Sequence, residues 1–197
     1  MGSDNPWASR FEKILSTEVI KDRSRLWAQH LPDLNADPVD VACRRILKEW
    51  KRVFSPTTQS TELILQMVGA AHAHAQESYP DARSFLMRCG ALPFEPGEPA
   101  IPLCITGLNG IGKSSIISAM TRILPPDGTV SVGSEHMEFP LMASSSVKVN
   151  RRTSSTSIVK ALGGSGFFSQ GLRVDEVSNA CARHLYRTGR CILLLDE

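Results

Sequence analysis

The sequence predicts an α/β fold in which a helical N-terminal region precedes a domain built on a parallel β-sheet. Three observations carry this prediction. Apolar residues recur at helical spacing through residues 1–91. A glycine-rich loop at 107–114 then stands between a short apolar run and an amphipathic segment, and a second apolar run at 191–195 ends in Asp196 and Glu197. Strand, loop, helix and a later buried strand, in that order, are typical of a parallel sheet with crossover helices.

The bulk composition is that of an ordinary globular protein. The chain has 197 residues, 42% of them hydrophobic, and a net charge of +2, so no global field favours nucleic acid or a membrane surface. No apolar stretch is long enough to span a bilayer, and the first ten residues lack the apolar core of a signal peptide. The five cysteines form no C-x-x-C pair, which indicates reduced cysteines and a cytoplasmic location, with Cys104 and Cys191 on core strands.

The region 1–91 is predicted to be helical. A first helix is expected over 7–29, and two more over about 60–77 and 81–89. Asp37 and Pro38 form an N-cap and first-turn pair. After them, an apolar stripe recurs at three- and four-residue spacing, formed by Val39, Cys43, Ile46, Leu47, Trp50, Val53 and Phe54. The opposite side is basic, with Arg44, Lys48, Lys51 and Arg52, and a solvated face explains it more simply than a nucleic-acid contact.

Residues 92–101 are predicted to be an extended connector. Pro93, Pro96 and Pro99 recur at every third position, and Pro102 continues the series, which suits a polyproline-like segment. The domain boundary is therefore placed here, with a nucleotide-binding domain over 102–197.

The glycine-rich loop matches the phosphate-binding pattern G-x-x-x-x-G-K-[ST] at every fixed position. A buried strand is predicted over 102–106 before it, and a helix over 114–124 after it. Backbone amides would surround phosphate oxygens, Lys113 would reach the β- and γ-phosphates, and the Ser114 hydroxyl would bind Mg²⁺. ATP and Mg²⁺ are the expected cofactors, and the predicted nucleotide-binding residues are Gly107, Leu108, Asn109, Gly110, Ile111, Gly112, Lys113, Ser114 and Ser115.

The stretch between the loop and the last strand leaves alternatives open. Two short β-like runs, 129–132 and 147–149, could each be the second core strand, or they could pair with each other as a hairpin. A Ser- and Thr-rich segment over 144–157 carries Lys148, Arg151 and Arg152. Helices are predicted over 156–162 and 174–188.

The apolar run at 191–195 is predicted to be the strand whose end completes the nucleotide site. Asp196 would lie beside the Mg²⁺ shell with Ser114, and Glu197 would orient the attacking water, with Lys113 as the second catalytic group. An Asp-Glu pair favours a hydrolytic ATPase over a small-molecule kinase. A P-loop domain normally continues beyond this point, so we expect a piece of a longer protein, a sheet truncated after this strand, and weak or no ATP turnover.

These motifs in this order resemble the TniB/TnsC-type AAA+ ATPases that regulate transposition. The most distinctive likeness is Ser157-Ile158-Val159-Lys160-Ala161-Leu162-Gly163, which precedes a helix and the final strand. The resemblance covers about residues 100–197 and implies ATP hydrolysis, self-assembly along duplex DNA and communication with a transposase. By position in the family, it implies DNA-backbone contacts by Lys148, Arg151 and Arg152. The second hypothesis is a signalling or adaptor NTPase with a protein partner, and the third is a small-molecule kinase.

Overall fold

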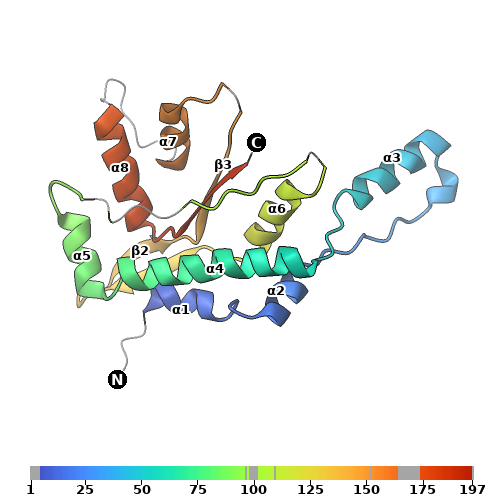
Figure 1. The fold of residues 1–197 in the computed structure, drawn as a ribbon. Helices are drawn as coiled ribbons and strands as arrows, with labels where there is room; N and C mark the ends of the chain where they lie inside the picture. Colours follow the sequence, from blue (N-terminus) through green and yellow to red (C-terminus); the bar gives the residue numbers. More distant parts are fainter. Residues whose placement is uncertain are drawn as a thin grey trace.

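The computed structural model describes residues 5–95, 97, 102–108, 110–150, 152–163 and 174–196. Within them the protein is a mixed α/β structure, mostly helical, with two small two-stranded sheets (Figure 1). None of the helices in this part of the chain combines the length and the apolar character needed to cross a membrane.

Residues 5–24 form two helices, whereas the sequence predicted one over 7–29. Helix α1 (Pro6–Glu12) ends at Lys13, and α2 (Thr17–Ser24) starts after Ser16. The single-helix prediction is wrong because Ser16 adopts an extended backbone, with φ of −134° and ψ of 135°, which interrupts the helical path. Ile14, which the sequence predicted to face inward on the helix, is still buried, but it lies in the turn between α1 and α2.

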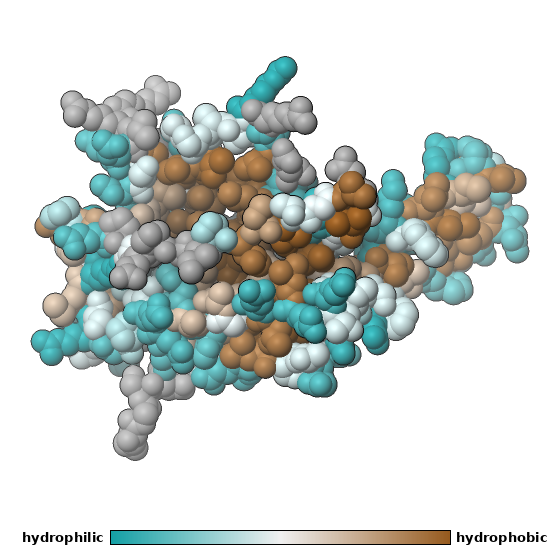
Figure 2. Space-filling view, viewed as in Figure 1, coloured by the Kyte–Doolittle hydropathy of each residue, from teal (hydrophilic) through white to brown (hydrophobic). Residues whose placement is uncertain are grey.

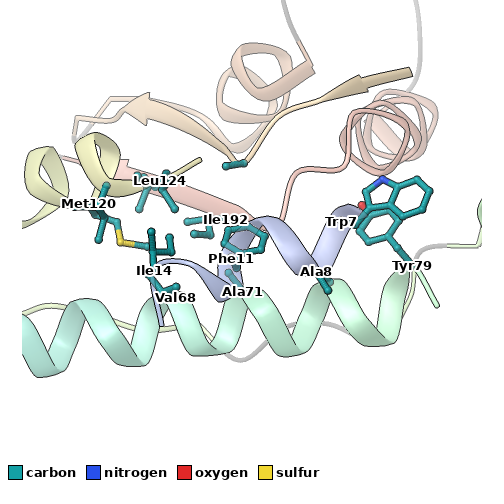
Figure 3. Packing of buried hydrophobic residues seen from close by; sticks show 14 of the residues in the cluster. Trp7, Ala8, Phe11, Ile14, Val68, Ala71, Tyr79, Met120, Leu124 and Ile192 are labelled. Atoms are coloured by element: carbon teal, nitrogen blue, oxygen red, sulfur yellow. The ribbon is translucent and has the colours of Figure 1, made fainter. Parts of the chain in front are cut away.

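Helix α4 (Thr58–Ser78) is the scaffold of the N-terminal region. Its 21 residues begin with a capping box, in which Thr57 and Ser60 satisfy each other's backbone amides. Helix α1 lies alongside it, so that Phe11 meets Ala71 of α4 and Trp7 stacks on Tyr79, the residue that follows α4 (Figure 3). The buried residues of α4 recur at three- and four-residue spacing, as an inward-facing helix requires: Ile64, Val68, Ala71 and Ala75.

Three other helical elements complete residues 1–91. The short 3-10 helix η1 (Leu34–Ala36) leads into α3 (Val39–Trp50), and α5 (Ala82–Gly90) follows α4. A bridge between Leu26 and Phe54 closes the chain between α2 and α4. Helix α3 therefore lies at the end of a projecting arm (Figure 1).

The two sheets resolve the alternatives for the central segment. Strand β1 (Gly128–Val132) pairs with β2 (Met137–Leu141) as an antiparallel hairpin. Strand β3 (Ser144–Lys148) pairs in parallel with β4 (Ile192–Asp196), through the helices α7 (Ser155–Gly163) and α8 (Val174–Arg187). The hairpin between 129–132 and 147–149 is thus wrong, and the 147–149 run belongs to the strand beside β4.

Helices cover both faces of the parallel pair. On one face, α6 (Lys113–Ile123) packs by way of Met120 and Ile123 into the same core as α4. On the other face, Val147 of β3 contacts Leu162 of α7 and Cys181 of α8. The predicted helices over 114–124, 156–162 and 174–188 are confirmed to within about two residues at each end.

The predicted strand over 102–106 is absent from the described structure. Residues 102–108 have no regular secondary structure, Leu103 is half-exposed and Cys104 is exposed, so the placement of Cys104 on a core strand is wrong. A strand forms only where neighbouring backbone groups satisfy its N–H and C=O groups. Strand β4 is bonded to β3 on one edge, and no described strand lies along its other edge. The parallel sheet therefore has two strands in the part of the chain that the structure covers.

Candidate nucleotide-binding site

Three glycines give the loop at 107–114 its shape. Gly110 and Gly112 have φ of +85° and +93°, a region that residues with a side chain rarely adopt. Gly107 has φ of +152°, and a Cβ atom built on it would lie 2.2 Å from Cδ1 of Ile111. The loop thus brings Ile111 back over its own beginning, which only glycine at position 107 permits without displacement.

Helix α6 starts directly after Gly112, so the loop ends on a helix N-terminus. The first backbone bond of this helix runs from the Ile116 amide to the Gly112 carbonyl at 3.0 Å. The amides of Lys113, Ser114 and Ser115 therefore lack acceptors within the helix, and both serines are exposed. Free amides at the positive end of a helix dipole bind anions.

Lys113 folds back over the loop. Its Nζ donates hydrogen bonds to the carbonyl oxygens of Gly107 at 2.9 Å and Leu108 at 3.0 Å. The ammonium group is thus held at the mouth of the loop by two neutral acceptors. Phosphate oxygens are stronger acceptors for a charged donor, so an incoming phosphate can replace these carbonyls.

The two predicted metal ligands meet. The Ser114 hydroxyl donates a hydrogen bond to Oδ1 of Asp196 at 2.9 Å, although the two residues are 82 positions apart in the sequence. Alternation along β4 explains the direction of Asp196: Ile192 and Leu194 are buried, and Asp196 follows them on the same face. The Val149 amide donates to the Asp196 carbonyl at 2.8 Å, which holds the end of the strand in place.

Hydroxyl and carboxylate oxygens are suitable ligands for Mg²⁺, which prefers one or two protein oxygens together with substrate phosphates and water. Ser114 and Asp196 supply such a pair beside the free amides of α6. The donor set therefore fits a magnesium ion bound together with phosphate. In the described part of the chain, no group of three or more His, Cys, Asp or Glu side chains could hold a metal ion in the absence of phosphate.

Lys148 lies on the strand next to Asp196. The β3–β4 register places the Cα of Lys148 opposite that of Asp196, and the lysine is exposed. Arg152 is also exposed, and its amide donates to Oδ1 of Asn150 at 2.9 Å, within the turn that follows β3. The family resemblance implied DNA contacts for both residues. The sequence did not predict that Lys148 adjoins the predicted metal ligand Asp196, because no sequence signal specifies which strands are neighbours.

Three predicted residues, Asn109, Arg151 and Glu197, lie outside the described residues. Leu108 and Ile111 are exposed at the tip of the loop. An open cavity of about 440 Å³ lies elsewhere, between α8 and residues 93–94, and its lining includes none of the residues of the loop, α6 or β4.

No family model matches the chain, and no curated protein or solved structure matches it either. The class of protein is therefore inferred from the geometry of the site.

Proposed function

We propose that this chain binds ATP with Mg²⁺ on the loop at 107–114. The observation that supports this most strongly is the hydrogen bond between Ser114 and Asp196. Each residue was selected by a separate motif, one in the glycine-rich loop and one at the end of an apolar strand. A chance match to either motif gives no reason for the two side chains to touch.

Each part of the site has a role in this proposal. The free amides of α6 and the Lys113 ammonium bind the β- and γ-phosphates, while Ser114 and Asp196 hold Mg²⁺. The ion neutralises charge on the phosphates when it is bound. Glu197 orients the attacking water, and Lys113 stabilises the charge that develops on the transferred phosphoryl group.

The proposed class is a Mg²⁺-dependent P-loop ATPase with an AAA+-like parallel sheet, of which β3 and β4 form one part. Its proposed role is the regulation of transposition: assembly of several copies on duplex DNA and communication with a transposase. The exposed cations Lys148 and Arg152, together with Arg151, are the proposed contacts to the DNA backbone. Lys148 lies opposite Asp196 in the β3–β4 register, so we expect the binding of DNA and the binding of nucleotide to influence each other.

The test is a titration of the protein with a fluorescent ATP analogue in the presence of Mg²⁺, followed by competition with unlabelled ATP. Saturable binding that ATP displaces is the expected result. Absence of binding, or a signal that ATP does not displace, would overturn the nucleotide assignment.

The DNA role needs its own measurement. A band-shift titration of duplex DNA with ATP and Mg²⁺ should show binding that weakens steeply between about 50 and 200 mM salt. Replacing Arg151 and Arg152 with alanine should weaken binding to all DNA sequences and flatten the log–log salt slope by roughly 0.9 for each lost phosphate contact. ATP binding without DNA binding would instead favour the signalling or adaptor NTPase.

A further inference from the structure

The chain between α2 and α4 forms an arm that stands away from the body of the protein (Figure 1). Its base is the two-bond bridge in which the amides and carbonyls of Leu26 and Phe54 pair at 2.9 and 3.0 Å. Its end is α3, a helix of 12 residues and hence about 18 Å long.

Helix α3 exposes the side that the sequence predicted to be buried. Val39 is 80% exposed and Trp50 is 76% exposed, whereas the charged Glu49 is only 8% exposed. Figure 2 shows apolar residues gathered on the projecting arm. We call this surface the arm face; it is the apolar stripe along α3 and the residues just after it, namely Val39, Cys43, Ile46, Leu47, Trp50 and Val53, which are all exposed.

Polar contacts fix this orientation. The Glu49 carboxylate accepts a hydrogen bond from Nη1 of Arg52 at 2.9 Å and one from the Gln29 amide at 3.3 Å. One turn earlier in α3, Arg45 pairs with the Asp37 carboxylate and donates a hydrogen bond to the Pro32 carbonyl at 3.1 Å. The polar side of α3 is therefore tied to residues 29–37, and the apolar stripe is held outward as a preorganised surface.

We propose that the arm face binds the arm face of a second copy of this chain, with the two α3 helices antiparallel. The charges beside the stripe select this partner and this direction. Asp40 and Lys51 are 11 residues apart, about three helical turns, so they lie in line along one flank of the stripe. Two antiparallel helices can be aligned so that the two copies of Ile46 lie opposite each other. Asp40 of one copy then lies opposite position 52 of the other, one residue from Lys51.

Symmetry forms this pairing twice, whereas a parallel arrangement would bring each flank against the opposite flank of the other helix and so leave Asp40 and Lys51 without this pairing. Both groups are available for it. Among the described residues, the Asp40 carboxylate pairs with Arg44 alone, in an exposed contact of the kind that contributes little to stability. Lys51 has no ion-pair partner among the residues that the structure describes. The same alignment sets Val39 of one copy opposite Val53 of the other.

The interface that the two α3 helices can form is small. Each helix has 12 residues, which is little beside the about 20–30 residues a side of a standard interface of roughly 1,600 Å². We therefore expect a weak dimer whose formation depends on protein concentration. This proposal concerns a surface apart from the nucleotide site and does not rest on ATP binding.

Sedimentation velocity of the whole chain, over a concentration series without nucleotide or DNA, tests the proposal. The wild type should shift from monomer to dimer, and Trp50→Glu should stay monomeric while keeping its circular dichroism spectrum, because Trp50 is exposed. The control Met87→Glu, at an equally exposed apolar residue of α5, should dimerise like the wild type. A wild type that is monomeric at every concentration, or a dimer indifferent to Trp50→Glu, would overturn the proposal.

Charge reversal tests the antiparallel direction. Asp40→Lys alone and Lys51→Asp alone should each weaken the dimer roughly 5- to 30-fold, because two attractive pairs become repulsive. The double variant Asp40→Lys/Lys51→Asp should recover most of the wild-type affinity. Failure of the double variant to recover would overturn the antiparallel pairing.

Discussion

Replacing Lys113 with alanine separates the chemistry of the loop from the stability of the fold. Nζ of Lys113 donates to two acceptors, the carbonyls of Gly107 and Leu108, and all three groups are at the surface. Removing the amine leaves carbonyls that water can reach. Each lost bond contributes at most about 1 kcal/mol, so the free energy of unfolding should fall by no more than about 2 kcal/mol and the chain should remain folded.

Nucleotide binding should respond far more strongly. With ATP bound, two charge-assisted hydrogen bonds to phosphate contribute about 1.5–3 kcal/mol each, and they replace two bonds to carbonyls that contribute about 1 kcal/mol each. The difference is about 1–4 kcal/mol, which corresponds to a loss of affinity of roughly 5- to 800-fold. Urea denaturation and titration with a fluorescent ATP analogue measure the two quantities on the same preparation.

The matched control is Lys160→Ala, which removes an exposed lysine from α7. It should leave both the unfolding curve and the nucleotide affinity unchanged. If Lys113→Ala binds ATP as tightly as the wild type, the phosphate-binding assignment of the loop is wrong.

Three further predictions concern the loop, the core and the response to pH. Gly112→Ala should weaken ATP binding, because φ of +93° disfavours a residue with a side chain. Its control is Gly69→Ala in α4, where no atom lies within 4 Å of the new Cβ; this variant should raise the free energy of unfolding by roughly 0.5–1 kcal/mol. Phe85→Ala should lower it by about 3–5 kcal/mol in urea denaturation, since the fully buried ring contacts Trp7, Tyr79 and Tyr186. Burial lowers the pKa of His74 below its ordinary 6.5, against the opposing effect of the Glu77 carboxylate and with a small contribution from Arg88, so the folded state disfavours the proton. The free energy of unfolding should be highest above about pH 6.5 and fall as the pH decreases below it, and His74→Gln should flatten that fall in urea denaturation at a series of pH values.

The local geometry of the candidate site was predictable from the sequence. Glycine at positions with positive φ and a lysine at the start of a helix are requirements of the backbone and of phosphate, so they leave a fixed pattern of letters. The prediction that Ser114 and Asp196 belong to one site came from the same source, and the structure brings their side chains into contact.

What failed depends on relations between distant segments. The stripe of α3 has a clear helical period, but the period does not say whether the apolar or the polar side meets the protein; the contacts of Glu49 and Arg45 decided it. The apolar run at 102–106 has the composition of a strand, yet a strand also needs a neighbour. The break at Ser16 escaped prediction because a serine between two helical turns is a weak signal, which tertiary packing decides.

The dependence of ATP binding on Mg²⁺ tests the proposed site most directly. The nucleotide titration is performed with Mg²⁺ and with EDTA on the wild type, on Ser114→Ala and on Asp196→Asn, with Glu138→Gln as the control for loss of an exposed carboxylate. We predict that Mg²⁺ tightens binding to the wild type and to Glu138→Gln. Both site variants should lose most of that gain while binding ATP in EDTA much as the wild type does. The same response to Mg²⁺ in all four proteins would contradict the assignment of Ser114 and Asp196 as the metal site.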